Sequence, residues 1–175
     1  TTFFPLFLIV FLVAVIYKYP LYIILITHNI MNYSNKYLPK SLSKKDKTKQ
    51  KRELNRSRRD YKTKRGKKKY HSRPKLKSYK NKSSSWTQQF HKLYPEAKSY
   101  TEISKATGIP SGALKAVVRK GKGAYYSSGS RPNQTAESWG KARMYSYILG
   151  GKTRKVDNHI TKEYNVKFKH KSKSS

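Results

Sequence analysis

The chain of 175 residues contains no cysteine. This absence excludes disulfide bonds, thiolate nucleophiles and zinc sites built from cysteine. Acidic residues are also scarce, with eight Asp and Glu against 41 Lys and Arg. The five histidines stand singly, and no two of them have the helical spacing of a metal site. The sequence therefore predicts no enzyme, no bound cofactor and no metal site, because catalytic acids, bases and ligands are few and scattered.

The excess of basic residues gives the chain a formal net charge of +33. Such a chain binds anions, and the available classes are nucleic acid, anionic membrane and acidic protein. Nucleic acid is the commonest partner of small proteins dense in Lys and Arg. We expect a nucleic-acid partner, with double-stranded DNA as the expected form. Asp157 and His159 are the two residues most like a catalytic pair, which would be that of a metal-dependent nuclease. We do not expect this activity.

Residues 1–30 form an apolar segment in which Lys18 is the only charge. The segment is long enough to cross a bilayer, and the basic run from Lys36 would hold its C-terminal side in the cytoplasm. A signal peptide fits less well, since no basic region precedes the apolar residues. A further interpretation is translated upstream sequence, with initiation at Met31, because AT-rich DNA read in frame yields these residues. Membrane association is expected only if residues 1–30 are genuine.

Residues 31–85 form a basic arm, with 22 Lys and Arg between Lys36 and Lys82 against three acids. With so few aliphatic residues, we expect it to be largely disordered and to form no core. Lys44–Lys62 is the best candidate for a helix that forms against a polyanion. The arm is either a soluble tail or localisation signal, or a phosphate-neutralising arm whose tyrosines stack or pack. Its expected nucleic-acid-binding residues are Lys44, Lys45, Arg52, Arg56, Arg58, Arg59, Lys67, Lys68 and Lys69.

Residues 86–160 carry helical spacing of apolar residues and predict a small helical domain, so that the predicted fold class is mainly α. Ser85–Gln88 and Ser99–Glu102 fit capping boxes that open the first two helices. Gly108 ends the second helix, and a third is expected to stop at the glycines of Lys120–Gly123. The last predicted helix covers Thr135–Leu149. Residues 161–175 form a basic tail, either a short strand or without order.

The two helices around Gly108 have the layout of a helix-turn-helix. The positions that carry this pattern are Ile103, Ser104, Gly108, Ile109, Leu114 and Val117. They resemble the core and turn positions of helix-turn-helix proteins such as the Lac repressor family. A helical hairpin used only for packing is the alternative. The expected nucleic-acid-binding residues of the pair are Ser111, Lys115, Arg119, Lys120 and Lys122. The first turn of the second helix lacks Arg, Asn and Gln, which predicts phosphate contacts with weak sequence selectivity.

Arg119–Asp157 contains a second set of recognisable runs. They are Lys-Gly-x-Gly-Ala-Tyr at Lys120–Tyr125, Gly-Ser-Arg-Pro at Gly129–Pro132, the Trp139–Tyr147 helix and Asp157, with a further likeness at Lys36–Lys47. These runs resemble an uncharacterised domain of large nucleocytoplasmic DNA viruses and some tailed phages. The resemblance implies a viral protein, located in the virion or the infected host cell, and no reaction.

Arg131 and Arg143 are candidates for an anion site, with Trp139 and Tyr125/Tyr126 as stacking surface. Alternatively, Trp139 is the central core residue and Arg143 binds the carbonyls of the loop. The predicted function is a viral nucleic-acid-binding accessory or virion protein, with contacts mainly to phosphates. The alternative is a structural minor virion protein that binds capsid or core proteins and is membrane-anchored if residues 1–30 are genuine.

Overall fold

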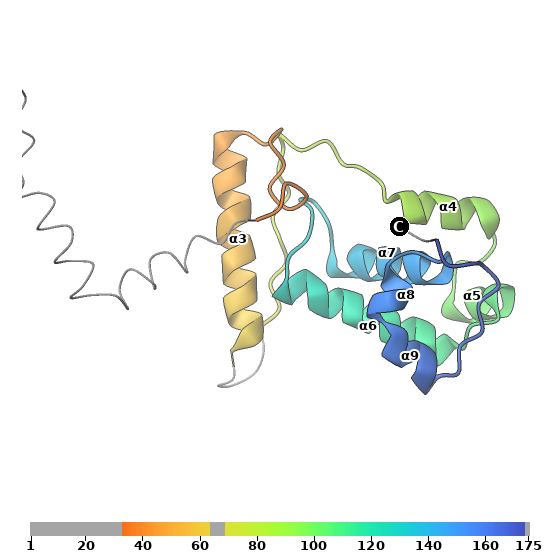
Figure 1. Cartoon of the computed structure of the whole chain (residues 1–175). Coiled ribbons are helices and arrows are strands. Elements are labelled where there is room, and N and C mark those ends of the chain that lie inside the picture. Colours follow the sequence, from red (N-terminus) through yellow and green to blue (C-terminus); the bar gives the residue numbers. More distant parts are fainter. Residues whose placement is uncertain (1–32, 64–68, 174–175) are drawn as a thin grey trace, which may run out of the picture. The chain divides into compact units, whose positions relative to one another are not determined.

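The computed structural model describes residues 33–63 and 69–173. Within this part all the regular elements are helices and there is no strand, which confirms the mainly α prediction (Figure 1). The helices are α3 (Lys44–Lys62), α4 (Ser85–Leu93), α5 (Tyr100–Thr107), α6 (Ser111–Ser127), α7 (Ala136–Ile148), α8 (Thr153–Val156) and α9 (Asn158–Glu163). The apolar segment, residues 1–30, lies outside the described residues. No helix among the described residues has the length and apolar character needed to span a bilayer.

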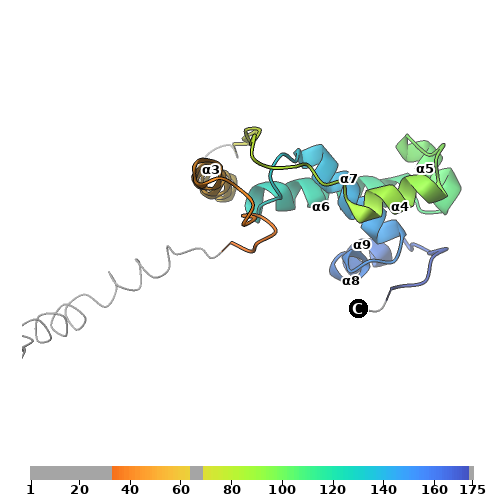
Figure 2. The ribbon, with the colours of Figure 1, turned by 90° about the horizontal axis from the view of Figure 1, so that it is seen from above.

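Helices α6 and α7 pack against each other more extensively than any other described pair, and form the centre of the fold (Figures 1 and 2). Gly121 and Gly140 allow this close approach. A Cβ atom added to Gly121 would lie 2.6 Å from the Cα of Gly140. The prediction that the glycines of Lys120–Gly123 end the helix is therefore wrong, and α6 continues to Ser127. The glycines serve helix packing here and do not terminate the helix.

The α5–α6 pair begins with the predicted capping box. The Ser99 hydroxyl accepts a hydrogen bond from the Glu102 amide, and the Glu102 carboxylate accepts one from the Ser99 amide. Gly108 ends α5 in the left-handed region at φ 76°, as expected of a C-cap glycine. The first turn of α6 packs on a different element, since a Cβ at Gly112 would lie 2.7 Å from the Tyr164 ring. This contact covers part of the turn that a recognition helix presents to DNA.

The predicted lack of a core in the basic arm is wrong for the described residues. Leu42, Leu54 and Leu76 are at most 7% exposed. The helix predicted at Lys44–Lys62 forms as α3 and crosses the C-terminal part of α6, where the Ser57 hydroxyl donates to the Tyr126 carbonyl at 3.1 Å. The three leucines are too far apart in sequence to show a periodic pattern, so their common burial depends on tertiary packing.

The loop between α6 and α7 binds the described part of the arm. The buried Gln50 amide of α3 donates to the Ser130 carbonyl at 3.3 Å. Arg73 donates to the Ser130 hydroxyl and to the Tyr125 carbonyl. Asn133 accepts from the Leu76 amide at 2.7 Å and donates to the Leu76 carbonyl at 3.1 Å. Buried polar groups of the loop thus find their partners on the arm, as buried backbone groups require.

Two further predictions concern the first helix and the tail. The capping box at Ser85–Gln88 is wrong, because Ser85 is already helical and its N-cap, Ser84, makes no side-chain capping hydrogen bond. In the tail, the strand alternative is wrong: the residues after α9 pack without forming a strand. Val166 is buried, and the Phe168 ring meets that of Tyr147 edge-on at 5.1 Å. The tail is thereby part of the helical domain.

Candidate functional site

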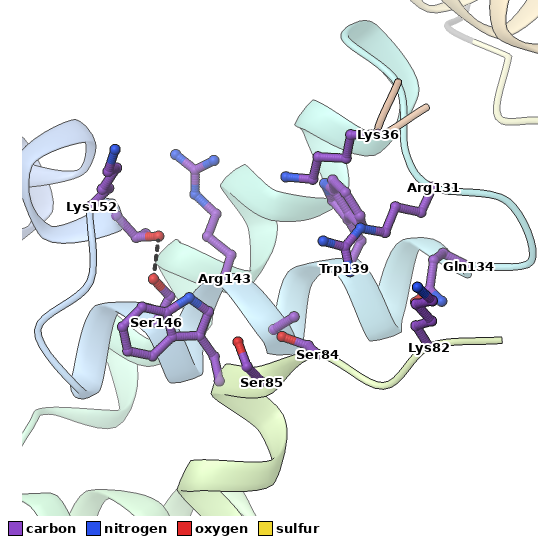
Figure 3. Close-up of a pocket in the computed structure, with 13 residues that line it drawn as sticks. Lys36, Lys82, Ser84, Ser85, Arg131, Gln134, Trp139, Arg143, Ser146 and Lys152 are labelled. Carbon is purple, nitrogen blue, oxygen red and sulfur yellow. Dashed lines mark hydrogen bonds between the residues drawn. The ribbon is translucent and has the colours of Figure 1, made fainter. Parts of the chain in front are cut away.

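A cavity of about 450 Å³ lies between the segment before α3, the start of α4, the α6–α7 loop and helices α7 and α8 (Figure 3). Five basic side chains line it: Lys36, Lys82, Arg131, Arg143 and Lys152. The remaining lining is polar or aromatic except for Ala142: Ser84, Ser85, Gln134, Ser146, Thr153, Trp86 and Trp139. Among the described residues, no carboxylate lines the cavity. This excess of positive charge in a concave site favours an anionic ligand.

Lys36 and Arg131 approach the same side chain, Trp139 (Figure 3). The Lys36 ammonium lies 5.2 Å from the centre of the indole ring, within the range of a cation–π contact. Lys36 is largely exposed as a residue, but partial burial of its ammonium and, second, the positive charge of Arg131 lower its pKa. The two cations repel each other, and no carboxylate of the described residues lies between them. A bound anion would therefore stabilise this arrangement.

Trp139 was also considered as the central core residue, and this expectation is wrong. It is only half-buried and lines the cavity, whereas Phe90 and Tyr147 are fully buried in the main core. Trp86, the second tryptophan of the chain, lines the same cavity. The Lys173 ammonium lies 5.0 Å from its ring centre. Both tryptophans of the chain therefore line one cavity from helices far apart in sequence.

Arg143 is held by Asp157. Its Nε and Nη2 donate to the two carboxylate oxygens at 2.8 and 2.7 Å, and Asp157 is 1% exposed. The alternative in which Arg143 binds loop carbonyls is wrong, since its partner is this carboxylate. The same contact occupies both carboxylate oxygens of Asp157, so the weak suggestion of a nuclease pair with His159 receives no geometric support. Arg143 lines the cavity as one half of an ion pair, which reduces the positive charge that it offers to a ligand.

A second hollow, of about 640 Å³, runs along α6 beside α9. It brings together the predicted residues Arg119 and Lys120 with Arg143, and Glu163 also lines it. Lys115 is exposed near the ring of Tyr100, at 6.0 Å from its centre. Ser111 is half-buried at the start of α6. Lys122 forms an ion pair with Glu137, which raises its pKa above the usual value. The predicted residues of α6 thus do not form one surface.

The predicted residues of α3 form a separate basic surface. Lys44, Lys45, Arg52, Arg56 and Arg59 are exposed, and the three arginines lie within 4.0 Å of Glu53 or Asp60. Arg58 donates to the Ser128 carbonyl at 2.8 Å and so also attaches α3 to the end of α6. Lys69 is exposed, whereas Lys67 and Lys68 lie outside the described residues. Surface ion pairs of this kind are weak and leave the arginines able to exchange partners.

The predicted stacking tyrosines have structural roles. Tyr125 is 2% exposed, and its hydroxyl donates to the Gln134 carbonyl at 3.0 Å. Tyr126 stacks on Tyr61 at 5.9 Å and meets Tyr70 edge-on at 5.0 Å. Tyr125 therefore offers no surface to a ligand, and Tyr126 offers only part of one.

Among the basic and aromatic residues of the cavity, four were not predicted as site residues: Lys36, Lys82, Trp86 and Lys152. Lys36 and Lys82 were hidden among the many lysines of the arm, where nothing in the local pattern distinguishes them. The helical spacing of Trp86 to Phe90 is typical of a residue on the buried face of a helix, so it gives no sign of a binding site. One feature of the sequence could have indicated the site: the chain has only two tryptophans, and both stand among basic residues. Partly exposed tryptophans commonly mark binding sites.

The family comparison matches residues 34–167 to the family of unknown function DUF5824. The matched range begins before α3, so it includes most of the basic arm together with the helical domain. Comparison with curated proteins and with solved structures finds no match. The match covers most of the chain, and the chain belongs to the DUF5824 family.

Proposed function

We propose that this protein binds nucleic acid, mainly through phosphate contacts and with weak sequence selectivity. The observation that carries the proposal is a cavity lined by two indole rings and by Lys36, Lys82, Arg131 and Lys152, with no carboxylate among the described lining residues. Phosphates satisfy the cations, and nucleobases have flat faces that fit indoles. An anionic lipid headgroup supplies the charge but no flat ring.

The surrounding charge supports the same partner. The exposed lysines and arginines of α3 and the basic hollow along α6 add cations outside the cavity. A polyanion several phosphates long can contact these surfaces together, whereas a small anion reaches only one. Large positive fields also speed the encounter with nucleic acid. The proposal includes double-stranded DNA as a ligand of these outer surfaces.

The proposed setting is a large DNA virus, in which the chain acts as an accessory or virion protein in the virion or the infected cell. The motifs at Lys120–Tyr125, Gly129–Pro132 and Trp139–Tyr147 support this setting through their resemblance to viral proteins. Within the structure the first motif lies in α6, which packs against α7, and the other two supply Arg131, Trp139 and Arg143 to the cavity.

The test is the salt dependence of binding by the full chain to fluorescent random-sequence DNA, single- and double-stranded, measured by anisotropy. If six to ten phosphates are contacted, the affinity should fall by roughly 10³- to 10⁵-fold between about 50 and 200 mM salt. Vesicles with anionic lipid and an acidic protein serve as comparison ligands. A nearly flat salt response with DNA, or tighter binding to the vesicles or the acidic protein, would contradict the proposal.

A further inference from the structure

The cavity has the features of a site for one nucleotide and not for a duplex. Its volume of about 450 Å³ is that of a pocket for a small ligand. Its walls include the indoles of Trp86 and Trp139, which offer flat apolar surfaces. In a duplex the base faces are stacked on one another and only their edges reach the grooves. An indole can therefore stack on a base only where that base is unpaired.

The positive groups lie where a phosphate attached to such a base would need them. Lys36 and Arg131 flank Trp139 (Figure 3). Ser84 and Ser85 directly precede Trp86 in the sequence, at the start of α4. Neither Lys36 nor Arg131 faces a carboxylate in the cavity among the described residues. The hydroxyls are able to donate to, or accept from, base edges, which matches the way single strands are recognised.

We propose that this cavity is a subsite for one unpaired nucleotide, with its phosphate between Lys36 and Arg131 and its base against the indoles of Trp86 and Trp139. The proposal rests on the proposed function and deepens it, because it assigns single-stranded nucleic acid to the cavity and leaves duplex DNA to the outer basic surfaces. Arg143 does not carry the phosphate, since Asp157 occupies its guanidinium. The hollow along α6 is the weaker candidate because it has no tryptophan and contains Glu163.

The test compares two variants of the full chain that lose the same charge. Lys36→Gln with Arg131→Gln removes two cations from the cavity. Lys105→Gln with Lys162→Gln removes two cations from exposed positions that do not line it. Affinities are measured by anisotropy for a labelled single strand and for a duplex of the same length, at one salt concentration. Urea unfolding of each variant shows whether the fold is kept.

The cavity variant should lose about tenfold or more in single-strand affinity relative to duplex affinity, as expected for lost charged hydrogen bonds. The control variant should lose affinity for the single strand and for the duplex by the same factor. If the cavity variant loses affinity for both ligands by the same factor, the subsite is contradicted but the proposed function is not. Absence of binding to either ligand by the unmodified chain would instead overturn the proposed function. If the double variant unfolds, Lys36→Gln alone, at an exposed side chain, must still lower the single-strand to duplex ratio.

Discussion

The close contact of α6 and α7 gives a sharp prediction about stability. In an ordinary helix interior, Gly→Ala stabilises by about 1 kcal/mol. At Gly121, however, the new methyl would lie 2.6 Å from the Gly140 Cα, where ordinary contacts are 3.4 Å or more. The obstructing atom is backbone, so the helices must separate, and overpacking of this kind costs about 1–3 kcal/mol. Separation also weakens the main core, to which both helices contribute. We expect Gly121→Ala to destabilise the fold by about 1–2 kcal/mol.

Gly123→Ala is the matched control, because it lies in the same helix two residues later. Its methyl would meet only the Tyr61 hydroxyl at 3.1 Å, at the far end of a side chain that can move. This variant should be unchanged or up to about 1 kcal/mol more stable. Urea unfolding distinguishes the two, since the midpoint of Gly121→Ala should fall by about 1 M for a typical denaturant slope. Equal midpoints for the two variants would refute the packing role of Gly121.

Two further predictions concern charged groups of the site. Asp157→Ala should lower the free energy of unfolding by about 3–5 kcal/mol, measured in urea, because it leaves the Arg143 guanidinium without its carboxylate. The double variant Arg143→Met with Asp157→Leu should recover most of this stability. No recovery would contradict the role of the ion pair. Affinity for single strands should decrease as the pH rises through the lowered pKa of Lys36, because only the charged ammonium binds phosphate. Lys36→Arg should move this decrease to higher pH in titrations at constant salt, and an unmoved pH profile would exclude Lys36 as the titrating group.

The sequence predicted the parts of the fold that local signals determine. The capping box at Ser99, the C-cap glycine Gly108 and the helix predicted at Thr135–Leu149, which is α7 in the structure, follow from neighbouring residues alone. Helices α8 and α9, which follow α7, were not predicted. Gly121 was misread because a glycine that ends a helix and one that lets two helices approach look alike in sequence. Which meaning applies depends on Gly140, a residue on another helix.

The packing of the described part of the arm and the cavity could not be predicted for a related reason. Leu42, Leu54 and Leu76 are isolated among charged residues, so hydrophobic patterning indicated no core. Leu54 and Leu76 contact the α6–α7 loop at Gly129 and Asn133. The cavity likewise depends on chain segments that are far apart in sequence. Trp86 and Trp139 meet in one site only because α4 packs against α7. Arg131 was identified from its motif, whereas its neighbour Lys36 became evident only in three dimensions.

The most direct test of the central claim is the indole emission of the cavity during binding. The chain has two tryptophans, so Trp86→Phe and Trp139→Phe each leave one indole to report, while keeping an aromatic ring. Titration of each variant with unlabelled single-stranded DNA should quench its emission in step with binding followed by anisotropy, because a base stacks against the indole. A duplex that binds the outer surfaces should leave the emission nearly unchanged. Unchanged emission in both variants at saturation with single strand would contradict the account.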